Sequence, residues 1–300
     1  MSIHFHPLKV KEVRKETADC VSVTFEIPEA LQTKFKYKQG QSLTMRTTIG
    51  KEEIRRTYSI CSSPLDNEWR VAVKKVEGGL FSTFANEQLN KGDVLDVMEP
   101  VGKFYTELDP ATKKNYLAFA AGSGITPVLS VIKTTLRTEP RSHFTLVYGN
   151  KSRPSIIFFE ELEGLKNKFL QRFNLVNILS RERTDSLINF GRINTGKLLE
   201  LEKLLDYSSF DEVFICGPEE MIFCVKDFLE AKGLDKKKVH FELFTSPGQK
   251  KSGVGSSDVP QSGSRNANRK RRHRESGVEG GPCSRISVKV DGRSFEFDLP

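Results

Sequence analysis

The sequence has no apolar run long enough to cross a membrane, few cysteines, and no histidine grouping typical of a metal site. Its first sixteen residues, MSIHFHPLKVKEVRKE, lack the apolar core of a secretory signal. The five cysteines are scattered along the chain: Cys20, Cys61, Cys216, Cys224 and Cys283. Their odd number and irregular spacing disfavour a disulfide framework and a bound metal ion. We therefore expect a cytoplasmic protein with no membrane partner.

Positive charge is concentrated in one segment. The formal net charge is +8, and residues 245–284 carry eight Lys/Arg against three Asp/Glu, a net charge of +5. The rest of the chain is only mildly basic, which does not indicate a nucleic-acid-binding fold. The run RKRRHR at residues 269–274 could bind nucleic acid or direct nuclear import. Short basic runs are common in solvated linkers, so we do not expect a nucleic-acid partner.

The first hundred residues have the pattern of short strands. Apolar and polar residues alternate at 20–27, 41–49, 55–61 and 69–76, with Gly, Pro, Asn and Asp between them. His4 and His6 alternate on an expected strand at the start. A helix is expected at 80–89, and residues 91–104 return to strand and turn. This spacing predicts a small antiparallel barrel over residues 1–110.

From residue 115 strands alternate with helices. The apolar strand NYLAFAA is followed by a helix, and the expected helices at 155–169, 195–205 and 219–233 each separate two strands. This order predicts a doubly wound parallel sheet over residues 111–244. Residues 245–284 have the Gly, Ser and charge content of a flexible linker. Residues 285–300 alternate around Asp291-Gly292, which predicts a hairpin.

Two glycine motifs follow strands of the expected parallel sheet. GSGITP, Gly122 to Pro127, stands between a strand and a helix, where unpaired N–H groups suit a pyrophosphate. It lacks full G-x-G-x-x-G spacing, so an ordinary helix cap remains an alternative. CGP, Cys216 to Pro218, ends a later strand, and Cys216 would face the same crevice as Gly122. The alternative for Cys216 is a buried structural thiol.

Two further stretches combine hydroxyls with basic side chains. RRTYSICSSP, from Arg55 to Pro64, holds a basic pair, an aromatic ring and several hydroxyls on one short strand. Arginine can neutralise a pyrophosphate, and a tyrosine ring can stack on a flat heterocycle. LSRERT, from Leu179 to Thr184, could hold a 2′-phosphate through Ser180 and Arg181. The alternatives are an exposed strand end and solvated loop charges.

Four motifs taken in order resemble the ferredoxin–NADP reductase superfamily. They are Arg56-x-Tyr58-Ser59, Gly79-x-x-Ser82, Gly122-to-Pro127 and Cys216-Gly217-Pro218. The resemblance covers about residues 5–244, and within the superfamily it is strongest to the phenylacetate-degradation type, the reductase components of phenylacetyl-CoA epoxidase. It implies an FAD-binding barrel and an NAD(P)-binding α/β domain.

The resemblance implies a role for each motif. Ser59 and Cys216 would shape the catalytic site, with Ser59 near the flavin N5 atom and Cys216 near the nicotinamide. The residues implied to bind FAD are Arg56, Thr57, Tyr58, Ser59, Val73, Lys74, Gly79, Ser82 and Thr83. Those implied to bind the nicotinamide nucleotide are Gly122, Ser123, Gly124, Thr126, Pro127, Ser180, Arg181, Gly217 and Pro218. Ser180 and Arg181 favour NADPH, with NADH as the alternative.

The expected activity is that of an FAD-dependent NAD(P)H oxidoreductase that passes electrons to a [2Fe–2S] centre and an oxygenase. The hairpin at 285–300 resembles the first strands of a plant-type ferredoxin domain. The C-x₄-C-x₂-C pattern of its cluster ligands is absent from these 300 residues, so we expect the cluster only in a longer chain. Two alternatives are a stand-alone reductase of flavodoxin, ferredoxin or free flavin, and a non-catalytic nucleotide- or nucleic-acid-binding protein.

Overall fold

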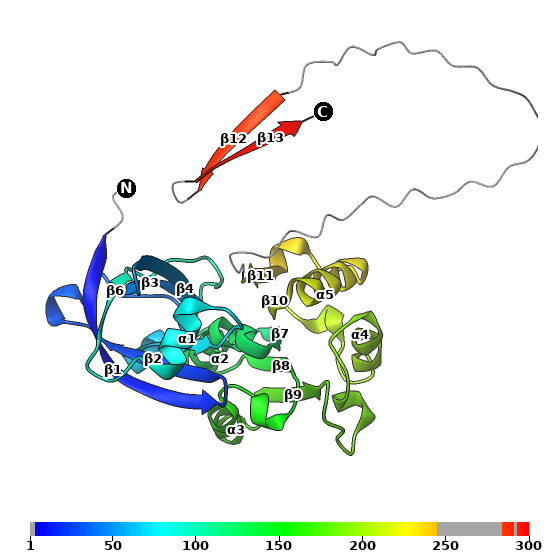
Figure 1. The fold of residues 1–300 in the computed structure, drawn as a ribbon. Coiled ribbons are helices and arrows are strands. Elements are labelled where there is room, and N and C mark those ends of the chain that lie inside the picture. Colours follow the sequence, from blue (N-terminus) through cyan, green and yellow to red (C-terminus); the bar gives the residue numbers. More distant parts are fainter. Residues whose placement is uncertain (1–3, 245–283, 291–292, 300) are drawn as a thin grey trace, which may run out of the picture. The chain divides into compact units, whose positions relative to one another are not determined.

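The computed structural model describes residues 4–244, 284–290 and 293–299. It divides into two compact units, Met1–Gln249 and Lys250–Pro300, which are described separately. The described part of the first unit contains an antiparallel sheet followed by a parallel sheet (Figure 1). We call the parts built on these sheets the antiparallel half (residues 4–110) and the parallel half (residues 111–244).

The antiparallel half is a six-stranded sheet in the order β4-β3-β6-β1-β2-β5. Its elements are β1 (Phe5–Thr17), β2 (Cys20–Glu26), β3 (Ser42–Ile49), β4 (Glu52–Ser59), β5 (Trp69–Lys74), α1 (Leu80–Glu87) and β6 (Val94–Met98). An isolated bridge between Ile60 and Val71 joins the two edges just beyond β4, which gives the sheet its barrel form. The strand expected around His4 and His6 is the start of β1, which runs on to Thr17.

Strand β2 is buried on both faces from Cys20 to Phe25. Val21 and Val23 point into the barrel core. On the other face Ser22 is 2% exposed, and its hydroxyl donates to Glu16 Oε1 at 2.6 Å. Cys20, at the start of that face, packs in the apolar cluster that continues into the parallel half. Ser22 and Thr24 of β2 are therefore both buried, and Glu26 at the end of the strand is exposed.

The parallel half is a five-stranded sheet in the order β11-β10-β7-β8-β9. Its elements are β7 (Asn115–Ala121), α2 (Ile125–Thr138), β8 (His143–Asn150), α3 (Phe159–Lys168), β9 (Phe173–Leu179), α4 (Thr195–Leu201), β10 (Glu212–Gly217), α5 (Glu219–Ala231) and β11 (Val239–Leu243). The order reverses after β9, which confirms a doubly wound sheet.

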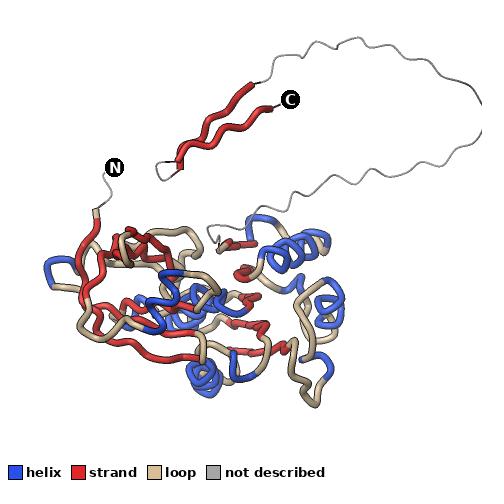
Figure 2. Tube along the Cα trace, in the orientation of Figure 1, coloured by secondary structure: helices blue, strands red, loops and turns tan. Residues whose placement is uncertain are grey.

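Helices cover both faces of the parallel sheet (Figure 2). Alternate residues of β7 enter two different cores: Ala118 packs with residues of α2 and α3, whereas Leu117 packs with residues of α4 and α5. The α2 face is also the one turned toward the antiparallel half, where Phe104 meets Phe214 edge to face at 5.3 Å between ring centroids. The predicted fold class, an antiparallel barrel followed by a doubly wound α/β half, is confirmed.

Four helices are shorter than their sequence pattern predicted, and α1 and α5 each end two residues early, at Glu87 and Ala231. Helix α3 begins at Phe159 rather than Ser155, because Ser155 belongs to a 3₁₀ turn and Phe158 adopts a left-handed backbone with φ of 63°. Phe158 is only 2% exposed, so burial of its ring offsets the backbone strain. Helix α4 ends at Leu201 instead of continuing to residue 205.

The second unit contains two described strands, β12 (Ser284–Val290) and β13 (Arg293–Leu299), which pair antiparallel. This pairing agrees with the predicted hairpin. The Asp291-Gly292 turn and the basic linker at 245–283 lie outside the described residues.

Candidate active site

Ser59, Cys216 and Glu242 meet at the junction of the two halves. Ser59 ends β4, is 4% exposed, and its hydroxyl donates to Glu242 Oε2 at 3.0 Å. Ser42 lies beside them, with its hydroxyl 3.5 Å from that of Ser59. Glu242 is on β11, directly opposite Cys216 on β10 in the parallel pairing. The two predicted catalytic residues therefore both adjoin one carboxylate.

Burial disfavours the ionised forms of both Glu242 and Cys216. Burial raises the pKa of Glu242, and the hydrogen bonds from Ser59 and Ser42 only partly oppose this effect. Burial, followed by the nearby carboxylate of Glu242, raises the pKa of the Cys216 thiol well above its usual value. Cys216 is 0% exposed, so at neutral pH it is a protonated, space-filling group and not a nucleophile. Glu242 is the titratable group of the site.

Sequence reasoning missed Glu242. The strand VHFEL was expected, yet its glutamate was not singled out. A signal was present: Glu242 is an acidic residue at the carboxyl end of a parallel-sheet strand, the edge at which ligands bind in doubly wound folds. Glu242 also lines a groove of about 280 Å³ with Lys103, Phe104, Val239, His240 and Phe241.

The remaining candidates on β4 present a cation and an aromatic ring at the surface. Arg56 is half-buried and makes no ion pair within the described residues; its guanidinium donates only to the carbonyl of Arg55 at 2.7 Å. By contrast, Arg55 is held by Glu53 at 2.6 Å. Tyr58 packs against Phe81 of α1 with ring centroids 5.5 Å apart.

The hydroxyl of Thr57, the fourth candidate on β4, is exposed and shares a 2.8 Å hydrogen bond with Thr44. Because Arg56 makes no ion pair within the described residues, its charge is available for an anion. The charge of Arg55 is already neutralised by Glu53.

The turn before α1 is built around Gly79. A Cβ on Gly79 would lie 2.5 Å from the Ser82 hydroxyl, so the turn needs glycine here. The hydroxyl of Ser82 accepts from Val76 N and donates to Gly79 O, both at 3.1 Å. It is therefore used within the turn, and the backbone N–H groups at the start of α1, together with half-buried Thr83, remain to meet a phosphate.

Val73 and Lys74, the candidates at the end of β5, lie next to this turn. The Val73 side chain is buried in the barrel core, and its carbonyl accepts from Asn86 at 3.0 Å. Lys74 pairs with Asp19 at 3.5 Å. Neither side chain is free to bind a ligand, because Val73 is buried and Lys74 is paired with Asp19. Any role of these two residues would be to support the neighbouring turn.

The turn Gly122–Gly124 lies directly against the CGP motif. A Cβ on Gly124 would lie 2.1 Å from the carbonyl oxygen of Cys216, so only glycine permits this approach. Gly122 has φ of +52°, and a Cβ there would meet nothing within 4 Å, which leaves an open cradle. The buried Tyr148 hydroxyl donates to the Gly122 carbonyl at 2.9 Å and fixes the turn.

The other candidates around this turn have mixed environments. The Thr126 hydroxyl donates to Ser123 O at 2.9 Å, and Thr126 and Pro127 are buried in the first turn of α2. Gly217 lies so close to Ala121 that a Cβ would be 3.2 Å from the Ala121 Cβ. Pro218 caps the start of α5. Ser123 is half-exposed and borders the cradle.

Ser180 and Arg181 follow β9 at the same carboxyl edge of the sheet. Their backbone amides donate to the carbonyls of Asn150 at 2.9 Å and Lys151 at 2.8 Å. Ser180 is half-buried and Arg181 is exposed, so both side chains can reach a ligand along this edge.

These features fit an FAD and a dinucleotide. An uncommitted arginine, a tyrosine face and a glycine helix start lie on the antiparallel half. A glycine cradle and a basic strand end lie on the parallel half, and the two groups meet at Ser59 and Glu242. Among the described residues, no helix is long and apolar enough to span a bilayer. Nor does that part of the chain hold three acidic, His or Cys side chains grouped for a metal ion.

Comparison with known proteins gives the same division. Residues 7–105 match the oxidoreductase FAD-binding domain, and residues 119–227 match the oxidoreductase NAD-binding domain. A 1,2-phenylacetyl-CoA epoxidase subunit from Escherichia coli K12 is 45% identical over 245 residues, covering 81% of this chain and 69% of the relative. The ferredoxin reductase component of 3-ketosteroid-9-alpha-monooxygenase from Rhodococcus rhodochrous is 34% identical over 241 residues, covering 80% and 65%.

The fold also matches a solved structure. The FAD/NAD-binding domain of nitric oxide dioxygenase from Vibrio cholerae superposes with a TM-score of 0.69 at 24% identity, covering 81% of this chain and 99% of that domain. The matched part spans about two thirds of the two curated relatives. The chain belongs to the ferredoxin reductase-type family of FAD- and NAD-binding flavoprotein oxidoreductases, as its motifs predicted.

Proposed function

We propose that this chain is the reductase component of an oxygenase system of the phenylacetyl-CoA epoxidase kind. It would take electrons from NADPH and deliver them through FAD to a [2Fe–2S] centre and then to the oxygenase. The observation that carries the proposal is the continuous path of contacts from Gly124 to Cys216, from Cys216 to Glu242, and from Glu242 to Ser59. That path would join the nucleotide cradle at Gly122 to β4, the proposed flavin-binding strand, which we call the flavin strand.

The chain's own residues would do the binding and the orienting. Arg56 would neutralise the FAD pyrophosphate, Tyr58 would face the ring system, and the amides at the start of α1 would hold phosphate. The cradle at Gly122 would receive the nicotinamide nucleotide. Bound flavin supplies the conversion between two-electron and one-electron transfer. Buried Cys216 would keep water away from the place where the two rings meet.

The Ser59–Glu242 pair can carry a proton. Ser59 Oγ donates to Glu242 Oε2, and Glu242 also lines the groove of about 280 Å³. A carboxyl group whose pKa is raised by burial exchanges protons nearer to neutral pH than an ordinary glutamate does. A proton released beside Ser59 would therefore have a route to that groove through Glu242.

NADPH is proposed over NADH on the strength of Ser180 and Arg181. An exposed guanidinium beside a hydroxyl at a strand end can hold a 2′-phosphate by charge-assisted hydrogen bonds. The four cysteines within the described residues are free thiols, which supports a reducing, cytoplasmic location.

A tethered acceptor is proposed over a separate one because of the β12–β13 hairpin. Its two seven-residue strands fit the start of a plant-type ferredoxin domain. The centre itself would need cysteines that these 300 residues do not supply. The alternative is a reductase of a separate ferredoxin or flavodoxin, which would work equally well when the hairpin is deleted.

The first experiment is a visible spectrum of the purified chain after reconstitution with FAD. We expect flavin bands that bleach on anaerobic addition of NADPH, and more slowly with NADH. A chain that takes up no FAD would contradict the proposal. Faster bleaching with NADH would overturn only the choice of nucleotide.

A further inference from the structure

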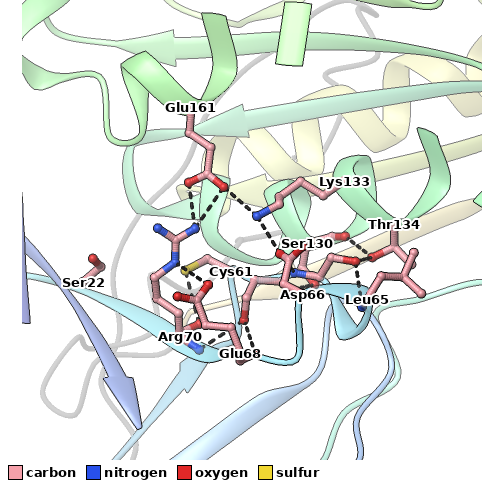
Figure 3. A network of polar contacts seen from close by, with 12 residues as sticks. Ser22, Cys61, Leu65, Asp66, Glu68, Arg70, Ser130, Lys133, Thr134 and Glu161 are labelled. Atoms are coloured by element: carbon pink, nitrogen blue, oxygen red, sulfur yellow. Dashed lines mark hydrogen bonds and ion pairs between the residues drawn. The ribbon is translucent and has the colours of Figure 1, made fainter. Parts of the chain in front are cut away.

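A cluster of charged side chains crosses the junction between the halves, on the segment that follows Ser59. The antiparallel half contributes Asp66, Glu68 and Arg70, and the parallel half contributes Lys133, Arg137 and Glu161. Figure 3 shows the carboxylate of Glu161 pointing toward both Arg70 and Lys133. We call these six residues the interdomain cluster. The reaction as described above uses none of them.

The first cross-junction pair is Arg70 with Glu161. One terminal nitrogen of Arg70 donates to both carboxylate oxygens of Glu161, at 2.7 and 3.0 Å. Arg70 is only 7% exposed, and its guanidinium lies 5.4 Å from the ring of Phe158, the residue with the left-handed backbone. Glu68 adds a second ion pair at 3.4 Å. The strained start of α3 is therefore held by a buried cation from the other half.

The second cross-junction group centres on Asp66. Its carboxylate pairs with Lys133 at 2.7 Å and with Arg137, both on α2. Lys133 also pairs with Glu161 at 2.7 Å, which links the two groups. Asp66 is fixed on its own side by the amide of Ser63, which donates to it at 2.9 Å.

Uncharged hydrogen bonds attach Ser62 and Ser63, which lie between Ser59 and Asp66 in the sequence, to helix α2. The Ser130 hydroxyl donates to the carbonyl of Ser62 at 2.6 Å. The hydroxyls of Ser63 and Thr134 share a fully buried hydrogen bond of 2.9 Å. Ser62 and Ser63 stand three and four residues after Ser59, in the continuation of β4. Two consecutive residues of the segment that follows β4 are therefore hydrogen-bonded to α2.

Helix α2 connects this attachment to the nucleotide cradle. It begins at Ile125, immediately after the Gly122–Gly124 turn. The residues of α2 that contact the antiparallel half recur every three or four positions and so lie on one face of the helix. They are Ser130, Lys133, Thr134 and Arg137. A single rigid element thus joins the cradle to the exit of the flavin strand.

The charges of the cluster are buried where the halves meet, and they are paired there with one another. Burial alone would raise the pKa of Glu161, but Arg70 and Lys133 lower it below its usual value. Burial opposes the charge of Lys133 in the same way, yet Glu161 and Asp66 raise its pKa. Removing one of these charges would leave its partners buried and uncompensated, which is strongly unfavourable.

We propose that the interdomain cluster is a positioning device, which fixes the end of β4, and with it Ser59, against the parallel half. Its members touch neither FAD nor nucleotide in the proposed function, and they act through the segment that follows Ser59. The consequence for electron transfer rests on that proposed function; the coupling of the two halves does not.

The coupling is tested by calorimetry of the full chain without FAD. The variant carries Asp66→Asn and Glu161→Gln, which keep side-chain shape and remove two charges from the cluster. The matched control carries Asp93→Asn and Glu160→Gln. Asp93 also accepts an amide three residues upstream, at 2.8 Å, but in an exposed turn, and Glu160 is the exposed neighbour of Glu161.

We expect one unfolding transition for the wild type and for the control. The cluster variant should unfold in two transitions, or in one transition whose midpoint temperature is about 5 °C or more below that of the wild type. The reason is that the halves no longer stabilise each other. A cluster variant that unfolds like the control would overturn the proposal.

The positioning role is tested on the chain loaded with FAD. Lys133→Met should lower kcat for NADPH oxidation by about tenfold while changing KM less than twofold, because misplacement of reacting groups costs rate while the nucleotide contacts remain. It should also weaken the long-wavelength absorption that nicotinamide gives when it stacks on flavin. Lys133→Arg, which keeps the charge, should restore both.

The outcomes separate the two proposals. If the wild type binds no FAD, the proposed function fails, and calorimetry still decides the coupling. If FAD binds and NADPH bleaches it, but Lys133→Met retains wild-type kcat and absorption, the positioning role is refuted.

Discussion

The hydroxyl of Ser59 donates a 3.0 Å hydrogen bond to the carboxylate of Glu242, a residue 183 positions further along the chain. The bond spans the two halves and lies beside the buried thiol of Cys216. It places the titratable group of the site on the last strand of the parallel sheet.

Removing the charge of Glu242 should stabilise the protein in a pH-dependent way. Because burial raises the pKa of Glu242, the stability contributed by its neutral form is fully present below the unfolded pKa of about 4.3 and is lost as pH rises through the folded pKa. Glu242→Gln should therefore match the wild type near pH 4 and exceed it at pH 8, by about 1.4 kcal/mol per unit of pKa shift.

Urea unfolding at a series of pH values measures this difference. The exposed Glu220→Gln serves as the control for the loss of a surface carboxylate. If the difference in unfolding free energy between Glu242→Gln and the wild type does not change with pH, the raised pKa of Glu242 is contradicted.

Arg56 and Arg55 should differ in their effect on FAD affinity. Arg56 has no ion pair within the described residues, whereas Arg55 is neutralised by Glu53. Arg56→Ala should weaken FAD binding by about tenfold or more, because a hydrogen bond to a charged group contributes about 1.5–3 kcal/mol. Arg55→Ala should change it less than threefold. Flavin fluorescence titration of the FAD-free chain gives both values; equal losses would refute the assignment of Arg56.

The choice of nucleotide should depend on Arg181. Arg181→Ala should raise KM for NADPH by about tenfold and leave KM for NADH unchanged, because only NADPH carries the 2′-phosphate. Arg183→Ala is the matched control, since its guanidinium lies over the ring of Phe190 at 5.6 Å. Steady-state kinetics with both nucleotides distinguish the variants. An equal effect on the two nucleotides would show that Arg181 does not read the phosphate.

Two glycines should respond in opposite ways to alanine. At Gly124 a Cβ would meet the Cys216 carbonyl at 2.1 Å, so Gly124→Ala should destabilise the chain by about 1–3 kcal/mol. At Gly164, inside α3, a Cβ would meet nothing within 4 Å. Gly164→Ala should stabilise by about 0.5–1 kcal/mol through helix propensity. Thermal unfolding measures both; a neutral Gly124→Ala would mean that the cradle can move away from β10.

Short-range patterns were enough to predict most elements and the turns that border the candidate site. Alternation identified β2 to β5, apolar runs identified β7 and β10, and the glycine turns identified the cradle and its neighbour Gly217. These features depend on residues close in sequence, where backbone sterics and burial periodicity act. The exact start of α3 was missed because Phe158 is held by burial and by Arg70, which no local pattern records.

The amino-acid sequence by itself determined the fold class and the family. Only the tertiary structure decided that Glu242 joins Ser59, that the Ser82 hydroxyl is used within its own turn, and that Arg70 pairs with Glu161 across 91 residues. The Ser59–Glu242 and Arg70–Glu161 contacts join distant segments, and their strength depends on the low dielectric between two packed halves. That environment exists only after the chain has folded.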